Sequence, residues 1–307
     1  MNILVTGGAG FIASHIVDAY VREGHTVSVL DNLSSGKKSN LNMAAEFFQC
    51  DLLDRPSMEK VFQNGRIEVV SHHAAQIDVR RSVTDPLYDA SVNILGLINL
   101  MECCVKYGVS RIIFASSGGA IYGEQDSFPA DETHATRPIS PYGISKLSSE
   151  HYLYYYSTVF GIDAVSLRYS NVYGPRQNPH GEAGVVAIFT SKTLRGEPTL
   201  INGDGKQTRD YVYVGDVARA NLVALRSGGF HAFNVGTGVE TDVNEISRLI
   251  RLYSENDVAV GHGPAKKGEQ QRSVLDARKI ARVLGWRPTV SLEEGLKATV
   301  AAFSRDR

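Results

Sequence analysis

The feature that most constrains this chain is a glycine-rich turn between a short apolar run and a helical pattern. Residues 2–6 are strand-like, Gly7-Gly8-Ala9-Gly10 follows them, and residues 11–23 have helical periodicity. Glycines at such a turn let backbone N–H groups approach an anion closely, and the helix N-terminus adds partial positive charge. The turn therefore predicts a βαβ unit that binds the pyrophosphate of a dinucleotide.

Acidic residues after the next two strand-like runs refine this prediction. Asp31 lies 18 residues beyond Ala13, near the spacing at which a carboxylate meets the adenosine ribose hydroxyls. Because a carboxylate repels a 2′-phosphate, Asp31 favours NAD over NADP as the cofactor. Asp51 and Leu52 follow the third run, where an adenine could lie between a polar and an apolar contact. From these two residues alone, a carboxylate that only begins the next turn is an equal alternative.

Strand-like and helical segments alternate through the first half of the chain. Strands are predicted at residues 2–6, 26–31, 46–51, 68–73, 111–116 and 163–169, and helices at residues 11–23, 57–63, 87–107 and 142–160. This order is typical of an α/β fold, a Rossmann-type parallel sheet with helices on both faces. The continuously apolar run at 111–116 fits a strand that is buried on both faces.

The alternation ends after Tyr169, where residues 171–184 are rich in glycine and proline and predict a loop. Helices are predicted beyond it at residues 185–195, 216–227, 243–254, 276–284 and 292–303, and strands at 199–201 and 209–213. We expect residues 1–170 to form the cofactor-binding domain and residues 171–307 to form mainly a smaller α/β domain for the substrate. A segment near 211–236 is expected to return to the first domain.

Composition excludes several classes of function. The chain has 32 Lys and Arg against 33 Asp and Glu, a net charge of -1, which gives no global attraction to nucleic acid or anionic membranes. No apolar run reaches the length needed to span a bilayer. The three cysteines, of which Cys103 and Cys104 are adjacent, form a poor disulfide framework and predict a reducing cytoplasm. No metal is expected, because the adjacent His72 and His73 point to opposite faces of a strand.

Tyr142 and Lys146 form the first candidate catalytic pair. They stand four apart at the start of a helical pattern and so share one face. A phenol has a pKa of about 10, but a nearby ammonium and a cationic nicotinamide ring favour the phenolate. Ser116 and Ser117 end a buried strand at the carboxyl edge of the sheet, where open α/β folds bind ligands. A hydroxyl there can relay a proton between a sugar hydroxyl and Tyr142.

Taken together, these motifs resemble the NAD-dependent epimerase/dehydratase family of the extended short-chain dehydrogenase/reductase superfamily, and within it the UDP-glucose 4-epimerases. The resemblance covers essentially the whole chain. It rests on Thr6-Gly7-Gly8-Ala9-Gly10-Phe11-Ile12, Asp31-Asn32-Leu33, His73-Ala74-Ala75, Ser116-Ser117, Tyr142-Gly143-Ile144-Ser145-Lys146, Leu167-Arg168-Tyr169-Ser170-Asn171-Val172-Tyr173-Gly174-Pro175, Arg209-Asp210-Tyr211 and Leu284-Gly285-Trp286.

The resemblance implies 4-epimerisation of a UDP-sugar through a transient 4-keto intermediate on tightly held NAD. In this reaction Tyr142 takes the proton of the sugar 4′-hydroxyl, Lys146 holds the phenolate and the nicotinamide ribose, and Ser117, with Ser116 behind it, bridges the substrate. The implied cofactor contacts are Gly7, Gly10, Phe11, Ile12, Asp31, Asn32, Ser35, Gly36, Asp51, Leu52, His73, Ala74, Ala75, Gln76, Asn93, Ser116, Tyr142, Lys146 and Tyr169.

The same resemblance assigns a substrate set in the second half of the chain. The implied substrate contacts are Ser117, Tyr142, Asn171, Thr199, Leu200, Ile201, Arg209, Lys266, Glu269 and Ser273. Lys266 stands where the family carries an arginine, so a bidentate grip on phosphate is in doubt there, and Glu269 replaces an aspartate. Ser273 replaces a bulky tyrosine of some members, which predicts room for N-acetylated sugars.

Other functions stay open beside this one. Gly118-Gly119 stands where related dehydratases carry Asp-Glu, which argues against elimination of water. A 4-epimerase for UDP-glucuronate or UDP-xylose is harder to exclude, since Arg80 and Arg81 could face a carboxylate. A non-catalytic NAD-binding protein would be expected to lose Tyr142 or Lys146. The tyrosine-rich run at 152–156, with helix 87–107, predicts a homodimer surface as in the family.

Overall fold

A seven-stranded parallel sheet forms the centre of the molecule. The computed structural model describes residues 1–180, 184–265 and 270–305. The strand order is β10-β6-β5-β4-β1-β2-β3, so the chain moves outward from β1 to β3 and then returns across β1 to build the other half. The bounds are β1 Asn2–Thr6, β2 Thr26–Asp31, β3 Glu46–Gln49, β4 Val69–His72, β5 Arg111–Ser117, β6 Asp163–Tyr169 and β10 Phe230–Val235.

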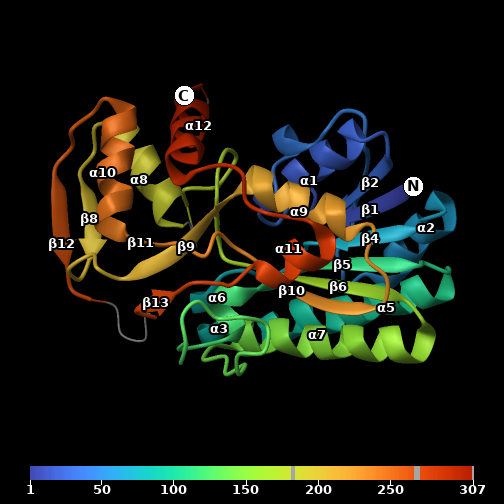
Figure 1. Cartoon of the computed structure of the whole chain (residues 1–307). Coiled ribbons are helices and arrows are strands. Elements are labelled where there is room, and N and C mark those ends of the chain that lie inside the picture. The colour runs from blue at the N-terminus through green and yellow to red at the C-terminus, as the bar shows by residue number, and fades with distance from the viewer. Residues whose placement is uncertain (181–183, 266–269, 306–307) are drawn as a thin grey trace.

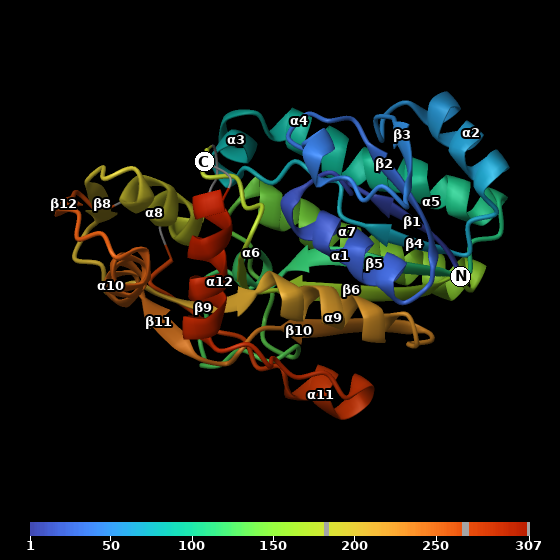
Figure 2. The same cartoon turned by 90° about the horizontal axis from the view of Figure 1, so that it is seen from above.

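Helices cover both faces of this large sheet (Figures 1 and 2). On one face lie α1 (Phe11–Arg22), α9 (Val214–Ala224) and α11 (Arg278–Leu284), and on the other lie α2 (Arg55–Gly65), α5 (Gly96–Lys106) and α7 (Pro141–Phe160). Ile3 and Val5 of β1 belong to the apolar cluster on the first face, while Leu4 between them belongs to the cluster on the second. The alternation of side chains along a strand thus supplies one core to each face.

A second, smaller region stands beside the carboxyl edge of the large sheet (Figure 1). We call it the small-sheet region; its core is a third apolar cluster that contains Phe189, Ile246 and Leu296. It has a four-stranded sheet of β7, β9, β11 and β13 and a pair of β8 with β12. Its elements are β7 Asn171–Tyr173, α8 Val185–Leu194, β8 Thr199–Asn202, β9 Thr208–Tyr213, β11 Glu240–Asp242, α10 Val243–Ser254, β12 Val260–Gly263, β13 Arg272–Ser273 and α12 Leu292–Arg305.

Four short helical turns of the described chain lie outside the sheets, and a fifth, η2 (Ser91–Leu95), precedes α5. The four are η1 (Lys38–Asn40), α3 (Val79–Thr84), α4 (Pro86–Ala90) and α6 (Gly118–Ile121). None of the helices in the described ranges is both long and apolar enough to cross a membrane.

The fold class predicted from the sequence is confirmed, and the structure corrects several elements. The predicted loop 171–184 begins with strand β7, which pairs with β9; a three-residue strand beside Gly174 has too short a pattern to be recognised locally. The predicted helix 87–107 begins at Pro86 and contains a π-helical turn, η2 (Ser91–Leu95). β10 was not predicted as a strand, although it pairs with β6 along six residues. The domain boundary at residue 170 and the return of residues 211–236 stay predictions.

Candidate active site

The glycine turn after β1 has the geometry that a dinucleotide site needs. Gly7 has a left-handed backbone (φ 72°), and a Cβ there would lie 2.7 Å from the backbone nitrogen of Ala74. Its own N–H donates to the carbonyl of Leu30 (2.7 Å). Only glycine avoids both the strained φ and the clash, so glycine lets the turn after β1 approach the backbone that follows β4.

The first turn of α1 is suited to an anion. The helix begins after Gly10, which has no side chain to cap it, and no acidic residue lies in its first turn. The N–H groups at the start of a helix have no intrahelical acceptor, so those around Phe11 and Ile12 are left to a ligand. A pyrophosphate would satisfy them and would interact favourably with the helix dipole. The residues present therefore fit NAD.

Asp31 lies at the end of β2 beside the same turn. One carboxylate oxygen accepts from the N–H of Ala9 (3.0 Å) and the other from the N–H of Leu33 (2.7 Å). Both oxygens lie 3.0 Å from the place a Cβ would take at Gly36. A carboxylate has about four acceptor sites, so two bonds leave capacity for ribose hydroxyls.

The remaining residues predicted for the adenosine end lie close to Asp31 in the fold. The side-chain amide of Asn32 donates to the carboxylate of Asp51 (2.6 Å), which links the ends of β2 and β3. Ser35 is exposed, and Leu52 is buried in the apolar core. The structure thus places Asn32 and Asp51 side by side, whereas the side chain of Leu52 packs in the apolar core.

A buried polar network lies beneath the centre of the site. The hydroxyl oxygen of Thr6 accepts from the N–H groups of His73 (3.1 Å) and Ala74 (3.2 Å). The His73 ring contacts the hydroxyl of Tyr169 (3.2 Å), and the side-chain amide of Asn221 in α9 donates to the same hydroxyl (2.8 Å). Burial lowers the pKa of His73 to about 4, so its ring is neutral near pH 7. Tyr169 is only 5% exposed, so it supports the site from below.

Asn93 braces the segment after β4, which carries Ala75 and Gln76. Its side-chain oxygen accepts from the N–H of Gln76 (2.8 Å), and its amide donates to the Gln76 carbonyl (3.0 Å) and to Ser145 of α7 (3.2 Å). Asn93 belongs to the π-helical turn η2, a feature that often accompanies functional sites. It therefore fixes the distance between this segment and α7.

Helix α7 places Tyr142 at the carboxyl edge of the sheet. Ser140 caps the helix by accepting from the N–H of Gly143 (3.1 Å), and Pro141 occupies its first turn, as is favourable there. A Cβ at Gly143 would lie 2.7 Å from the carbonyl oxygen of Ala120, so glycine lets the helix begin directly beside α6. The N–H of Tyr142 donates to Ser82 of α3 (3.2 Å).

Lys146 lies one turn further and is 4% exposed. Its ammonium is 5.9 Å from the ring centre of Tyr142 and donates to the carbonyl of Ala115 in β5 (2.9 Å). Burial lowers the pKa of Lys146 to about 8, while Asp89 and Glu150 act in the opposite direction. The amine is therefore still largely protonated at pH 7 and favours the phenolate of Tyr142.

The two serines at the end of β5 have different surroundings. The hydroxyl of Ser116 donates to Glu150 of α7 (2.6 Å), inside a buried ion pair with Arg168. Ser117 is half-buried and is the register partner of Tyr169. Within the described part of the chain its hydroxyl has no recorded hydrogen bond. Ser117 is thus the serine whose hydroxyl is not already held in the core.

On the small sheet, three of the predicted substrate residues lie on neighbouring strands. Asn171 is exposed on β7, and its side-chain oxygen lies 4.0 Å from the place of a Cβ at Gly119. Arg209 of β9 is the register partner of Ser273 in β13, and Ser273 is 4% exposed. The structure therefore brings Asn171 to the turn after Ser117 and places Ser273 beside Arg209.

Among the other predicted substrate residues, only some are accessible to a ligand. Of Thr199, Leu200 and Ile201 on β8, only Leu200 exposes its side chain (54%), while the other two are 2% exposed. Ile201 packs in the third apolar cluster. A base could contact this strand through Leu200 and the backbone, but not through all three side chains as expected. Lys266 and Glu269 lie outside the described residues.

Asp210 was not among the predicted site residues, although it follows Arg209 directly. Its buried carboxylate accepts from the N–H (2.8 Å) and the hydroxyl (2.6 Å) of Thr237, from the N–H of Gly238 (3.1 Å) and from that of Leu275 (3.3 Å). Leu275 in turn packs in an apolar cluster with Ile121 of α6. Asp210 thus ties the small sheet to the turn that follows Ser117. The only sequence signal was its place in the Arg-Asp-Tyr motif.

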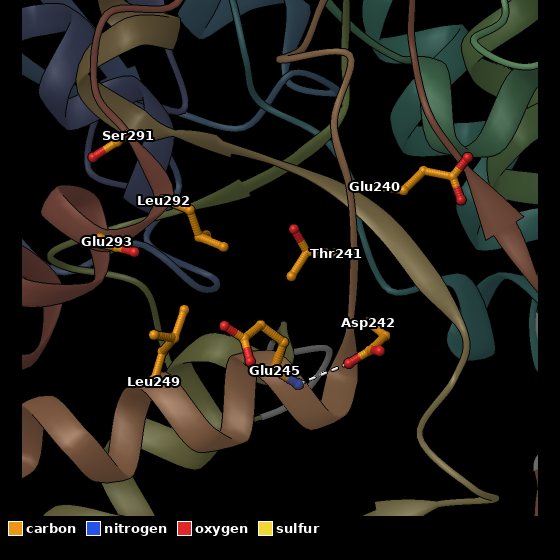
Figure 3. A pocket seen from close by; sticks show the side chains of 8 residues that line it. All are labelled: Glu240, Thr241, Asp242, Glu245, Leu249, Ser291, Leu292 and Glu293. Carbon is orange, nitrogen blue, oxygen red and sulfur yellow. Dashed lines mark hydrogen bonds between the residues drawn. The ribbon is translucent and has the colours of Figure 1, made fainter.

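A hollow of about 650 Å³ lies elsewhere, between β11 and the starts of α10 and α12 (Figure 3). It is acidic and open, and it is lined by Glu240, Thr241, Asp242, Glu245, Leu249, Ser291, Leu292 and Glu293. None of the residues predicted to bind cofactor or substrate lines it. The candidate active site is therefore the edge of the large sheet and not this hollow.

Comparison with known proteins agrees with this geometry. Residues 3–236 match the NAD dependent epimerase/dehydratase family. A UDP-glucose 4-epimerase of Mycolicibacterium smegmatis is 44% identical over 310 residues, which cover 99% of this chain and 98% of the relative. The crystal structure of UDP-glucose 4-epimerase from Thermotoga maritima with UDP-glucose has a TM-score of 0.98 at 52% identity, and the match covers 100% of this chain and 99% of that one.

A second solved structure is similar and carries the cofactor. UDP-glucose 4-epimerase from Thermus thermophilus in complex with NAD has a TM-score of 0.94 at 48% identity, with 99% of both chains covered. The match to the family extends over the glycine turn, Asp31, the serine edge, Tyr142, Lys146 and the large sheet through β10. The chain therefore belongs to the NAD dependent epimerase/dehydratase family.

Proposed function

We propose that this protein interconverts UDP-glucose and UDP-galactose by inverting C4 of the sugar, with NAD as its bound cofactor. The observation that carries the proposal is the pairing of Tyr142 and Lys146 at the start of α7, where Lys146 donates to the carbonyl of Ala115, two residues before Ser117 at the end of β5. The full-length similarity to UDP-glucose 4-epimerases of two other organisms supports the same activity.

NAD would be held by the turn at Gly7 to Ile12, by the carboxylate of Asp31 and by Lys146. When bound, NAD would supply a reversible acceptor for the hydride of C4, which the transient 4-keto sugar requires. The side chains around it contribute binding and orientation. The acid at Asp31 supports NAD over a cofactor with a 2′-phosphate.

Tyr142 acts as the general base for the sugar 4′-hydroxyl and returns the proton in the second half of the reaction. Lys146 supplies the positive charge that favours its phenolate. Ser117 orients the sugar hydroxyl toward Tyr142. The choice of Ser117 over Ser116 is supported by the bond from Ser116 to Glu150, which holds that hydroxyl in the core.

The nucleotide part of the substrate would contact the small sheet. Asn171 and Arg209 would bind the diphosphate, Leu200 would cover the base, and Lys266 and Glu269 keep the roles that the sequence predicts for them. Ser273, beside Arg209, leaves more room than a tyrosine would. For this reason the site should also accept UDP-GlcNAc and UDP-GalNAc.

We also propose that the protein is a cytoplasmic homodimer. Tyr152, Tyr155 and Val159 form an exposed stripe on α7 at helical spacing, with exposed fractions of 38%, 46% and 59%. Leu95 of η2 is likewise exposed. A second copy could cover these side chains. All three cysteines are buried thiols, which fits a reducing compartment. Light scattering that shows only monomer at micromolar concentration would exclude the dimer.

The first test is incubation of the purified protein with UDP-galactose, without added NAD, followed by separation of the UDP-sugars. A mixture with UDP-glucose is expected. Tyr142→Phe should lower the rate by a factor of about 10³, since general base catalysis contributes roughly 10² to 10⁴. Ile144→Ala, an exposed position two residues away, is the matched control. Absence of conversion by the wild type, with and without added NAD, would reject UDP-galactose as its substrate.

A further inference from the structure

A buried ion pair lies directly behind the serine edge, and the reaction as described does not use it. Glu150 of α7 and Arg168 of β6 are 4% and 7% exposed. Their side chains form a bidentate contact, with distances of 2.6 Å from Arg168 Nη2 and 3.0 Å from Arg168 Nε to the two carboxylate oxygens. Breaking a buried pair is costly because the partner is left as an uncompensated charge. Such a pair near a reaction centre calls for an explanation.

Helix α7 forms hydrogen bonds with two successive residues of β5. Lys146 donates to the carbonyl of Ala115 (2.9 Å), and one turn later Glu150 accepts from the hydroxyl of Ser116 (2.6 Å). The next residue of the strand is Ser117, and Tyr142 lies one turn before Lys146. The two contacts therefore set the position of Ser117 relative to Tyr142.

Arg168 extends this arrangement across the sheet. Ser116, Arg168 and Asn234 are register neighbours on β5, β6 and β10. The guanidinium of Arg168 also donates to the hydroxyl of Tyr122 (2.9 Å), which donates to the side-chain oxygen of Asn234 (2.7 Å). Glu150 is therefore held directly by side chains of β5 and β6, and through Arg168 and Tyr122 by β10, so its carboxylate cannot easily turn away from Ser116.

Glu150 is also one of the charges around Lys146. The ionisable groups that face the ammonium are Asp89 of α4, Glu150 and Tyr142 of α7, and the neutral His72 and His73 at the end of β4. Only the two carboxylates favour the charged amine against its burial. Removing Glu150 would leave Asp89 alone in that role.

We propose that Glu150 is a positioning residue for the epimerisation site: it fixes the end of β5 behind Ser117 and places a carboxylate one turn of α7 from the Lys146 ammonium. The proposal rests on the proposed function, since it assigns Glu150 a role in that reaction. Glu150 does not reach the substrate; it acts through Ser116 and Lys146.

Glu150→Gln tests the charge, because glutamine keeps the shape of the side chain and can still accept from Ser116. We expect the fall of kcat at alkaline pH to begin about one pH unit lower than in the wild type. At pH 8 kcat should be about five-fold lower, because a fall of one unit from a pKa of about 8 reduces the protonated fraction of Lys146 from about one half to about one tenth. KM should stay within two-fold. The matched control is Asp163→Asn, which breaks the ion pair of Asp163 with Arg111 (2.7 Å) at the opposite ends of β6 and β5. Its pH profile should not move.

Glu150→Asp separates position from charge. It keeps the carboxylate but shortens the arm, so the alkaline fall should stay where the wild type has it while kcat decreases. A Glu150→Gln profile that coincides with that of Asp163→Asn, with kcat within two-fold, would overturn the role in charge. Wild-type kcat in Glu150→Asp would overturn the role in position, and this variant decides alone if Glu150→Gln does not fold.

A binding measurement keeps this inference distinct from the proposed function. Lys146 would hold the nicotinamide ribose, so NAD affinity, measured by calorimetry against pH, should fall at lower pH in Glu150→Gln than in the wild type. If that shift occurs but no UDP-sugar is converted, the inference stands and the proposed function is wrong. If conversion occurs and neither profile shifts, only the inference is wrong.

Discussion

The large sheet and the small sheet place their functional residues in different ways. In the large sheet, seven parallel strands in continuous register end at one edge, and the glycine turn, Asp31, Ser117 and α7 meet there. In the small sheet, β7, β11 and β13 have only three, three and two residues, and the strands come from distant parts of the chain. Their positions depend on single side chains such as Asp210.

The difference indicates which part of the site is rigid. The residues that we propose to hold the reacting atoms stand on long buried elements, whose backbone bonds and apolar clusters fix them redundantly. The residues that we propose to bind the nucleotide stand on short strands joined by loops, where one substitution can change the geometry. We expect substitutions near the large sheet to affect cofactor binding and rate, and substitutions near the small sheet to affect substrate affinity and choice.

Acidification should produce the largest difference in stability between the large-sheet and small-sheet regions. The pKa of His73 is lowered to about 4 by burial, and that of His72 is lowered too. Below pH 6.5 the unfolded chain therefore binds protons that the folded chain does not, so the free energy of unfolding decreases as pH falls from 6.5 to 4. His73 alone contributes about 3 kcal/mol to that loss. Denaturant unfolding between pH 7 and pH 4 measures it.

Hydrogen exchange locates the acid effect. Amides of β1 and β4 should lose protection before those of α10 when the pH is lowered to 5. His151→Gln, at an exposed position of α7, is the control and should not alter the slope of stability against pH. Uniform loss of protection in both regions would contradict the assignment of the effect to His72 and His73.

Gly7→Ala should weaken NAD binding about 100-fold, because the new Cβ would displace the turn from Ala74. Gly24→Ala is the matched control: Gly24 also has a left-handed backbone (φ 79°), but nothing lies within 4 Å of its Cβ position. It should cost only about 1–2 kcal/mol of stability and leave NAD affinity unchanged. Calorimetric titration with NAD distinguishes the two, and equal affinities would show that the turn is not at the cofactor.

Asp210→Asn should raise KM for the UDP-sugar about ten-fold and lower stability by roughly 1–3 kcal/mol, since an NH₂ group would replace an oxygen that accepts buried hydrogen bonds. The effect on kcat should be smaller, because Ser117 on β5 and Tyr142 on α7 do not depend on the small sheet for their positions. Asp204→Asn, whose side chain is 69% exposed, is the control. A fall in kcat without a change in KM would contradict the assignment of substrate affinity to the small sheet and of rate to the large sheet.

Ser273→Tyr should reduce the rate on UDP-GlcNAc relative to UDP-galactose by a factor of about five, of the order expected when a pocket loses the space of a small group. The ratio of kcat/KM for the two substrates measures this effect. Ser304→Tyr at an exposed position of α12 should leave the ratio unchanged. If the wild type converts UDP-GlcNAc no faster than a control without enzyme, the prediction that the site accepts N-acetylated sugars is wrong.

Much of the large-sheet site could be predicted from local sequence. The turn at Gly7, Asp31 at the end of a strand and the Tyr142–Lys146 spacing each have a signature shorter than one βαβ unit. The structure places all of them at the same edge. β7, β13 and the π-helical turn at Asn93 have no such signature, because a strand of two or three residues and a one-turn distortion take their stability from neighbours.

The sequence by itself determined the α/β fold, the glycine turn after β1, the acid at the end of β2 and the shared face of Tyr142 and Lys146, because each follows from backbone geometry and spacing along the chain. Only the tertiary structure decided that Ser116 is held by Glu150, that Thr199 and Ile201 are enclosed, and that Asp210 joins β9 to residues 237, 238 and 275. These contacts join segments up to 65 residues apart. Local periodicity carries no information about such pairings, since they depend on which buried polar group finds its partner when the sheets pack.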